Sequence, residues 1–157
     1  MKKIFLLLTI SLFFSISIQA QSIVGNWTVT SIIIESDMAY PPIEPVTLNI
    51  DENGKISGSG GCNVYGGTYS FKNPMKSFTK AKRIKFADII STKKFCERVS
   101  NTENAFFRSL REAATVVFVK EELIIKNRAT FVRSPRGKVT IQNTMTLVRE
   151  VKPKVRT

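Results

Sequence analysis

The fold is decided by one stretch, Ser57-Gly58-Ser59-Gly60-Gly61-Cys62-Asn63-Val64-Tyr65-Gly66-Gly67-Thr68-Tyr69. Six of the eight glycines of the chain lie between Gly54 and Gly67. Glycine adopts positive φ and lets other backbone come close, so this density predicts a tight and specific loop. Residues that alternate between apolar and polar lie on both sides of the stretch, which is typical of strands. We therefore predict that the loop connects antiparallel strands.

Strands are predicted on the N-terminal side of this loop. Residues 23–34 are rich in β-branched residues and include the one tryptophan, so a first strand should point Trp27 and Val29 into a core. Alternation over residues 46–50 predicts the next strand. Asn53-Gly54 then predicts a type I′ hairpin turn, because both residues accept positive φ.

More strands are predicted on the C-terminal side. Tyr69 and Phe71 alternate with polar residues, and residues 77–90 predict one or two strands with basic side chains on the outer face. Five short strands with tight connections follow near the C-terminus, over residues 116–120, 123–126, 129–133, 138–142 and 144–148.

One helix is predicted, over residues 101–114. Ser100 and Glu103 have the spacing of a capping box, in which the serine caps the helix and the glutamate bonds back to the serine backbone. Phe106 and Leu110 recur at helical spacing and give the helix an apolar face. Many short strands and one amphipathic helix predict a mainly β fold, a small antiparallel β-barrel with the helix packed against it.

The N-terminus has the pattern of a secretory signal peptide. Two lysines precede an uncharged run over residues 4–18, and Ala20 offers a small residue for cleavage. We predict a signal peptide over residues 1–20, a single domain over 21–150 and a basic, disordered tail over 151–157. An uncleaved anchor is the alternative. After cleavage no segment of the mature chain is apolar enough to span a membrane, and a periplasmic or secreted protein is expected.

The composition is strongly basic. Removal of Lys2 and Lys3 lowers the formal net charge from +12 to +10. This charge favours anionic partners such as lipid head groups or acidic glycans, although a solvated basic surface explains it equally well. Nucleic acid is not expected as a partner, since no base-stacking motif is found and the compartment is wrong.

The chain has two cysteines and no histidine. An even number of cysteines in an exported chain predicts a disulfide between Cys62 and Cys96, and two free thiols are the alternative. The bond would close a loop of about 34 residues and stabilise the fold by about 3–4 kcal/mol. The lack of histidine removes Ser-His and Cys-His nucleophile pairs and the commonest metal ligand. We predict no enzyme activity, no metal and no cofactor.

The glycine-rich stretch resembles the signature of META domains, the family that includes HslJ. A second family segment is similar to Ser91-Thr92-Lys93-Lys94-Phe95-Cys96, and a third to Glu103 with the apolar helix that follows. The resemblance implies a bent, lipocalin-like antiparallel barrel holding one helix. It also implies association with the cell envelope, stress and antibiotic-resistance phenotypes, and virulence in protozoa. The second segment departs from the pattern at Ser91, and residues 127–142 are longer than the family's closing hairpin.

The motif residues are expected to act mainly in the structure. Asn63 either adopts left-handed geometry or caps the loop with its amide, and a ligand-binding amide is the alternative. Tyr65 and Tyr69 are expected to be partly buried with satisfied hydroxyls, and Thr92 to bond to the same loop. The candidate motif residues are Gly58, Gly60, Gly61, Cys62, Asn63, Tyr65, Gly66 and Tyr69, with Thr92, Cys96 and Glu103 in the other segments.

Two functions of different class follow. The first is a non-catalytic, exported envelope module that binds a protein or an anionic surface. The second is a secreted protease inhibitor, because small disulfide-braced barrels present rigid loops at little ordering cost. Three prolines predict a loop over residues 35–45, so Tyr40-Pro41-Pro42 is one candidate contact loop, and the turn that contains Arg136 is the other.

Overall fold

A computed structural model describes residues 22–34, 38–72, 80–134 and 137–150. The predicted signal peptide and C-terminal tail lie outside these residues, as does Arg136. Side-chain surroundings are described for these ranges except at residues 38–40, 131–134 and 137–141.

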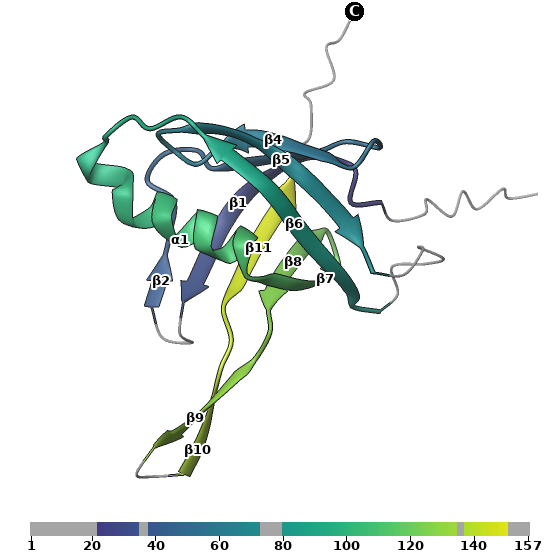
Figure 1. The fold of residues 1–157 in the computed structure, drawn as a ribbon, viewed down its shortest axis with the longest axis vertical. Helices are drawn as coiled ribbons and strands as arrows, with labels where there is room; N and C mark the ends of the chain where they lie inside the picture. The colour runs from purple at the N-terminus through teal and green to yellow at the C-terminus, as the bar shows by residue number, and fades with distance from the viewer. Residues whose placement is uncertain (1–21, 35–37, 73–79, 135–136, 151–157) are drawn as a thin grey trace, which may run out of the picture.

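Within the described residues, eight antiparallel strands form a closed barrel (Figure 1). The barrel closes because β1 pairs with β3 along one edge and with β11 along the other. This confirms the predicted fold class. The order around the barrel is β1 (Gly25–Ile34), β3 (Thr47–Ile50), β4 (Lys55–Ser59), β5 (Val64–Phe71), β6 (Lys82–Ser91), β7 (Ala113–Val119), β8 (Glu122–Asn127) and β11 (Thr144–Arg149).

The barrel interior is filled by apolar side chains that alternate along these strands. Trp27 and Val29 are buried as predicted, and the indole Nε1 of Trp27 donates to the carbonyl of Ile23 at 2.7 Å. The largest completely enclosed side chains are Trp27, Phe106, Ile23, Ile32, Leu48, Ile50, Leu110, Leu123, Ile125, Met145, Leu147 and Val46.

The predicted loop over residues 35–45 is partly wrong. Met38–Tyr40 form strand β2, which pairs antiparallel with Ile32–Ile34 of β1. Prolines cannot donate to a ladder, but the three residues before Pro41 keep their N–H groups and can pair. The chain from residue 41 to residue 46 is irregular, as the prolines predict.

The β3–β4 hairpin forms where Asn53-Gly54 predicts it, but the type I′ turn is wrong. Gly54 has φ of 81°, whereas Asn53 is not among the non-glycine residues with positive φ. Asp51 explains the difference. Its Oδ1 accepts from the backbone N–H of Asn53 at 2.9 Å and of Lys55 at 2.7 Å. The side chain therefore closes a three-residue turn that needs positive φ only at its glycine.

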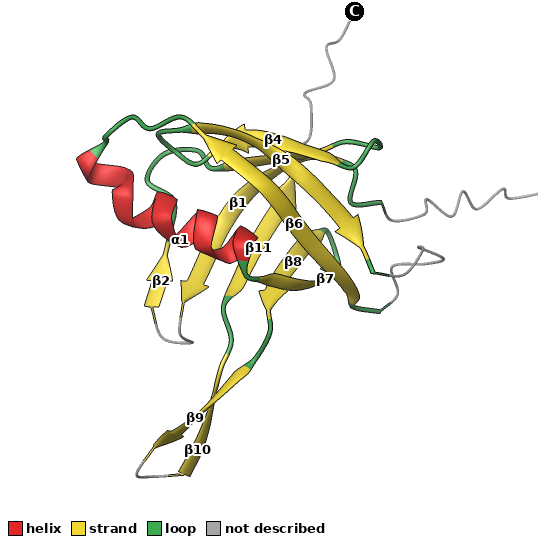
Figure 2. Ribbon diagram, in the orientation of Figure 1, coloured by secondary structure: helices red, strands yellow, loops and turns green. Residues whose placement is uncertain are grey.

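Helix α1 (Ser100–Arg111) lies across the barrel and follows a short 3₁₀ turn, η1 (Glu97–Val99) (Figure 2). The predicted capping box is wrong. The 3₁₀ turn runs directly into α1, so Ser100 has helical backbone angles and Val99 occupies the cap position without a side-chain cap. The helix is also shorter than predicted, because Ala113 and Ala114 begin β7. In the part of the chain that the structure describes, no helix combines the length and the apolarity needed to cross a membrane.

Residues 82–91 form one long strand, β6, which separates early from β7. The two strands pair only at Lys82 with Val116 and at Arg83 with Thr115. The extra length predicted between residues 127 and 142 is a second, two-stranded sheet, β9 (Thr130–Ser134) with β10 (Gly137–Ile141). This hairpin extends away from the barrel (Figure 1).

The packing of α1 gives a direct test of the fold. Phe106 is 0% exposed and its ring lies edge-on to Tyr65 at 5.3 Å, whereas Phe95 is 85% exposed. Phe106→Ala should destabilise the protein by about 3–5 kcal/mol, because it removes a large side chain from the core. Phe95→Ala is the matched control and should change stability by no more than about 0.5 kcal/mol. Urea unfolding measures both, and equal midpoints for the two variants would contradict this packing.

Candidate functional site

The glycine-rich loop is joined covalently to the segment before α1. Cys62 and Cys96 form the predicted disulfide, with their Cα atoms 6.1 Å apart. The loop also closes on itself, because the N–H of Gly60 donates to the carbonyl of Asn63 at 2.8 Å. The disulfide therefore fixes a loop that already has its own turn.

The carboxylate of Glu103 in α1 accepts hydrogen bonds from the same loop. Its Oε1 accepts from the backbone N–H of Asn63 at 2.7 Å and, at a longer 3.4 Å, from that of Cys62. Its Oε2 accepts from the amide Nδ2 of Asn63 at 2.7 Å. The side chain is 9% exposed and forms no ion pair with a described residue. Its charge is therefore stabilised by N–H donors of the loop rather than by a cation.

The amide of Asn63 links this carboxylate to the second family segment. Nδ2 also donates to the carbonyl of Lys94 at 3.1 Å. Oδ1 accepts from the hydroxyl of Thr92 at 2.8 Å and from the N–H of Lys94 at 2.7 Å. An amide has two donor hydrogens and two acceptor lone pairs, so all are used inside the protein. This confirms the structural amide and the predicted bond from Thr92.

Two alternatives for Asn63 are not supported. Asn63 is not among the residues with positive φ, so the left-handed conformation is wrong. The side chain is 5% exposed and its amide has no hydrogen-bonding capacity left for a ligand.

The two tyrosines of the motif are satisfied as predicted. The hydroxyl of Tyr65 donates to the carbonyl of Thr47 at 2.9 Å, and that of Tyr69 donates to the carbonyl of Asp51 at 2.7 Å. Burial raises the pKa of Tyr65 far above its usual range. Burial also raises the pKa of Tyr69, with a further contribution from the negative charges of Asp51 and Glu52. Both hydroxyls stay protonated and serve as structural donors.

At two positions of the loop, the structure shows directly why the residue is glycine. A side chain at Gly60 would place its Cβ 2.8 Å from Oε1 of Glu103, so only glycine lets the carboxylate approach. Gly61 has φ of 105°, which side chains rarely adopt. Gly58 and Gly66 lie in β4 and β5 on either side of the loop. The glycine density therefore serves the contact with Glu103 as well as the turn.

Exposed apolar side chains gather around this braced loop. Val64 and Ile90, which are 60% and 77% exposed, line one shallow groove of about 530 Å³ beside Gly66. Phe95 lies between Lys94, which is bonded to Asn63, and Cys96 of the disulfide. We call Val64, Ile90 and Phe95 the motif-end patch.

The other predicted contact residues lie elsewhere. The backbone of Tyr40 ends β2, Pro41 is exposed and Pro42 is half-buried, while Arg136 is outside the described residues. No group of three or more metal-ligating side chains occurs within residues 22–34, 38–72, 80–134 and 137–150.

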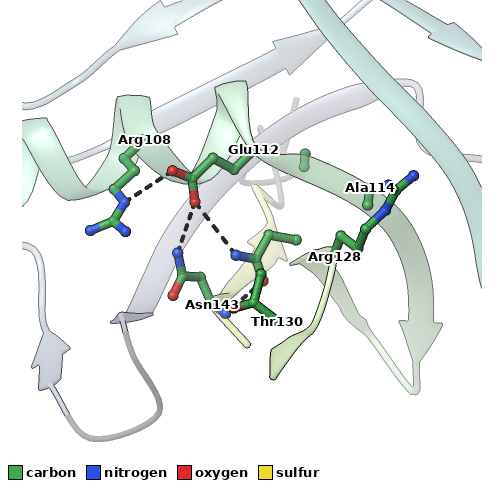
Figure 3. Close-up of a pocket in the computed structure, with 8 residues that line it drawn as sticks. Arg108, Glu112, Ala114, Arg128, Thr130 and Asn143 are labelled. Carbon is green, nitrogen blue, oxygen red and sulfur yellow. Dashed lines mark hydrogen bonds and ion pairs between the residues drawn. The ribbon is translucent and has the colours of Figure 1, made fainter. Parts of the chain in front are cut away.

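Sequence reasoning missed a second polar network, at the base of the β9–β10 hairpin (Figure 3). Glu112 accepts from Nε of Arg108 at 3.1 Å and from Nδ2 of Asn143 at 3.1 Å. Asn127 and Asn143 pair through their backbones, and Oδ1 of Asn127 accepts from the N–H of Asn143 at 2.7 Å. The sequence feature that could have predicted this network is the pair of asparagines, Asn127 and Asn143, on either side of the β9–β10 hairpin.

The role of Glu103 can be tested with an uncharged variant of the same shape. In Glu103→Gln an NH2 group replaces one carboxylate oxygen and must face a donor of Asn63, which is either the backbone N–H or Nδ2. The amide of Asn63 cannot turn to relieve this, because Thr92 and Lys94 hold its oxygen. We expect a loss of about 1–3 kcal/mol in the free energy of unfolding, measured with urea. Glu121→Gln, at an exposed turn, is the control and should lie within about 0.5 kcal/mol of the wild type. An equally small effect of Glu103→Gln would show that this carboxylate does not hold the loop.

Comparisons with known proteins agree with this geometry. The chain is similar over 82% of its length, with 13% identity and a TM-score of 0.50, to the crystal structure of a DUF4847 family protein from Bacteroides vulgatus, of which it covers 94%. At this identity the likeness shows the fold alone. No curated protein matches the sequence. The model of the META domain family matches residues 20–138, which is more than half of the chain. The disulfide-braced barrel therefore belongs to the META domain family.

Proposed function

We propose that this META domain is a non-catalytic binding module that holds another protein through the motif-end patch. One observation carries the proposal. The three most exposed large apolar side chains of the described residues are Phe95, Ile90 and Val64, and all three lie at the braced loop. Clustered exposed apolar side chains mark interaction sites more often than isolated ones do.

The frame beneath the patch suits it to binding. Val64 and Ile90 are carried by paired strands, since Gly66 of β5 is opposite Ile90 of β6. Phe95 is held between a residue bonded to Asn63 and a disulfide cysteine. A surface that is already ordered loses little conformational freedom on association, so more of the contact energy is kept as affinity.

The charges around the patch define the partner's chemistry. Lys93 and Lys94 are exposed on the segment that leads to Phe95. A fitting partner offers an apolar pocket with carboxylates or other anionic groups at its rim. A protein of the cell envelope or an anionic envelope surface meets this description, in keeping with the formal net charge of +10 that remains after removal of Lys2 and Lys3.

The compartment and the lack of catalysis belong to the same proposal. The Cys62–Cys96 disulfide fits an oxidising compartment, as the signal-peptide pattern of residues 1–20 predicts. The sequence has no histidine to serve as a general base. Stress response or virulence, which the family resemblance implies, is the expected physiological setting.

The proposal is tested by comparing what the protein and a patch variant capture. Ile90→Ser/Phe95→Ser should lose proteins that the immobilised wild type retains from envelope extracts through a high-salt wash. The control Val119→Ser changes an exposed side chain elsewhere and should retain them. Capture of the same proteins by the wild type and the patch variant would reject the patch, as would release of everything at low salt.

Protease inhibition is a second candidate, favoured by the shape of the β9–β10 hairpin. The hairpin extends from the barrel (Figure 1), and hydrogen bonds between Asn127 and Asn143 fix its base. Such a projection suits entry into an active-site cleft, and Pro135-Arg136 connects its strands. The Tyr40-Pro41-Pro42 loop is less suited, because Tyr40 of β2 is paired with Ile32 of β1.

The inhibitor candidate predicts a residue-specific effect. Micromolar protein should inhibit a protease that cleaves after basic residues, and Arg136→Ala should abolish the inhibition because it removes the side chain that enters the specificity pocket. Lys120→Ala, which removes a basic residue from a different turn, should still inhibit. Absence of inhibition across a panel of proteases at micromolar protein would exclude this candidate.

A further inference from the structure

We propose that the open pocket where β7 leaves β6 binds a multiply charged anion of the phosphate class. We call it the fork pocket; it has a volume of about 590 Å³. It is separate from the motif-end patch, since Arg83 and Ile90 lie seven residues apart along β6. The proposal therefore stands or falls independently of the proposed function.

The pocket is a consequence of the short β6–β7 ladder. The two strands pair only at Lys82–Val116 and Arg83–Thr115, and beyond these pairs they separate. The space between them is lined by Ile84 of β6 and by Ala113 and Ala114 of β7, which are too small to fill it. The base of the β9–β10 hairpin forms the far wall with Arg128 and Gln142.

Among the described residues, four cationic residues line this pocket and no acidic residue does. They come from three separate parts of the chain and are Lys72, Arg83, Lys85 and Arg128. None forms an ion pair or a side-chain hydrogen bond with a described residue. A concave site with one sign of charge concentrates its potential and attracts counter-ions.

Two other arginines of the barrel show the contrast. Arg108 in the adjoining pocket is paired with Glu112 at 3.1 Å, and Arg149 stacks over the ring of Trp27 at 4.6 Å. Figure 3 shows Arg128 pointing away from Glu112 and Asn143. Glu112 thus pairs with Arg108, whereas Arg128 lines both the adjoining pocket and the fork pocket.

The lining matches the chemistry of phosphate oxygens. The guanidinium groups of Arg83 and Arg128 offer planar pairs of donors, which suit phosphate, and the two lysines add charge. Ser70 and Thr115 are polar residues of the same lining. Four positive charges are best balanced by an anion with several negative charges, such as a diphosphate or a phosphorylated head group.

The segment that follows β8 is also basic in sequence. The sequence has no acidic residue from Leu123 to Arg149, and Arg133 and Lys138 belong to β9 and β10. A phosphate-bearing chain or surface would therefore meet no repulsive carboxylate from this segment. The phosphate can come from a lipid head group or from a soluble or polymer-borne source.

The test compares two variants with the same loss of charge. Arg83→Gln/Arg128→Gln changes the pocket, and Arg98→Gln/Lys120→Gln removes two exposed charges outside it. In calorimetric titrations of the full protein with diphosphate at moderate salt, the pocket variant should bind at least about tenfold more weakly than the wild type. The control should differ from the wild type by no more than about threefold.

Vesicles then distinguish the sources of phosphate. Pocket-dependent sedimentation with phosphatidylglycerol vesicles, but not with phosphatidylcholine vesicles, would identify a lipid head group. Pocket-dependent binding of diphosphate without such sedimentation would identify a soluble or polymer-borne phosphate. Equal weakening by both variants would show diffuse surface charge and overturn the proposal, as would a lack of diphosphate binding by the wild type.

Discussion

The interaction on which the rest of this structure depends is the contact between the carboxylate of Glu103 and Asn63. It joins α1 to the start of β5, and the amide of Asn63 carries the connection on to Thr92 and Lys94. The Cys62–Cys96 disulfide closes the same arrangement covalently. A buried carboxylate that lacks a cation is tolerable only when donors surround it, so loop, helix and second segment must all be in place together. The glycine-rich motif therefore fixes the position of α1 on the barrel.

The motif-end patch and the fork pocket lie at opposite ends of β6. The first lies where the loop is braced, and the second where β6 and β7 separate. At the motif end, the braced loop presents Val64, Ile90 and Phe95 on a backbone that is already ordered. At the other end of β6, the ladder with β7 stops after two pairs and leaves a space lined by several basic residues. One surface is apolar and the other cationic, so the same small domain offers contacts of two different chemistries.

The sequence predicts the barrel well because its core alternates along strands and its helix has a continuous apolar face. Prediction from the sequence fails where the same residue pattern is compatible with two different local structures. Ser100 and Glu103 have the spacing of a capping box, but the glutamate is used by a loop about 40 residues earlier in the chain. The fork pocket is invisible in the sequence for a related reason, since Arg83 and Arg128 become neighbours only through the topology. Asp51 changes a turn that Asn53-Gly54 alone would form differently.

The most direct test of this account is a double-mutant cycle between Glu103 and Asn63, measured by urea unfolding of the oxidised protein. If the carboxylate and the amide depend on each other, the double variant Glu103→Ala/Asn63→Ala should be less destabilised than the sum of the single variants. The expected coupling energy is more than about 1 kcal/mol. Effects that add to within about 0.5 kcal/mol would show that the two side chains act independently, and would contradict the central role of this contact.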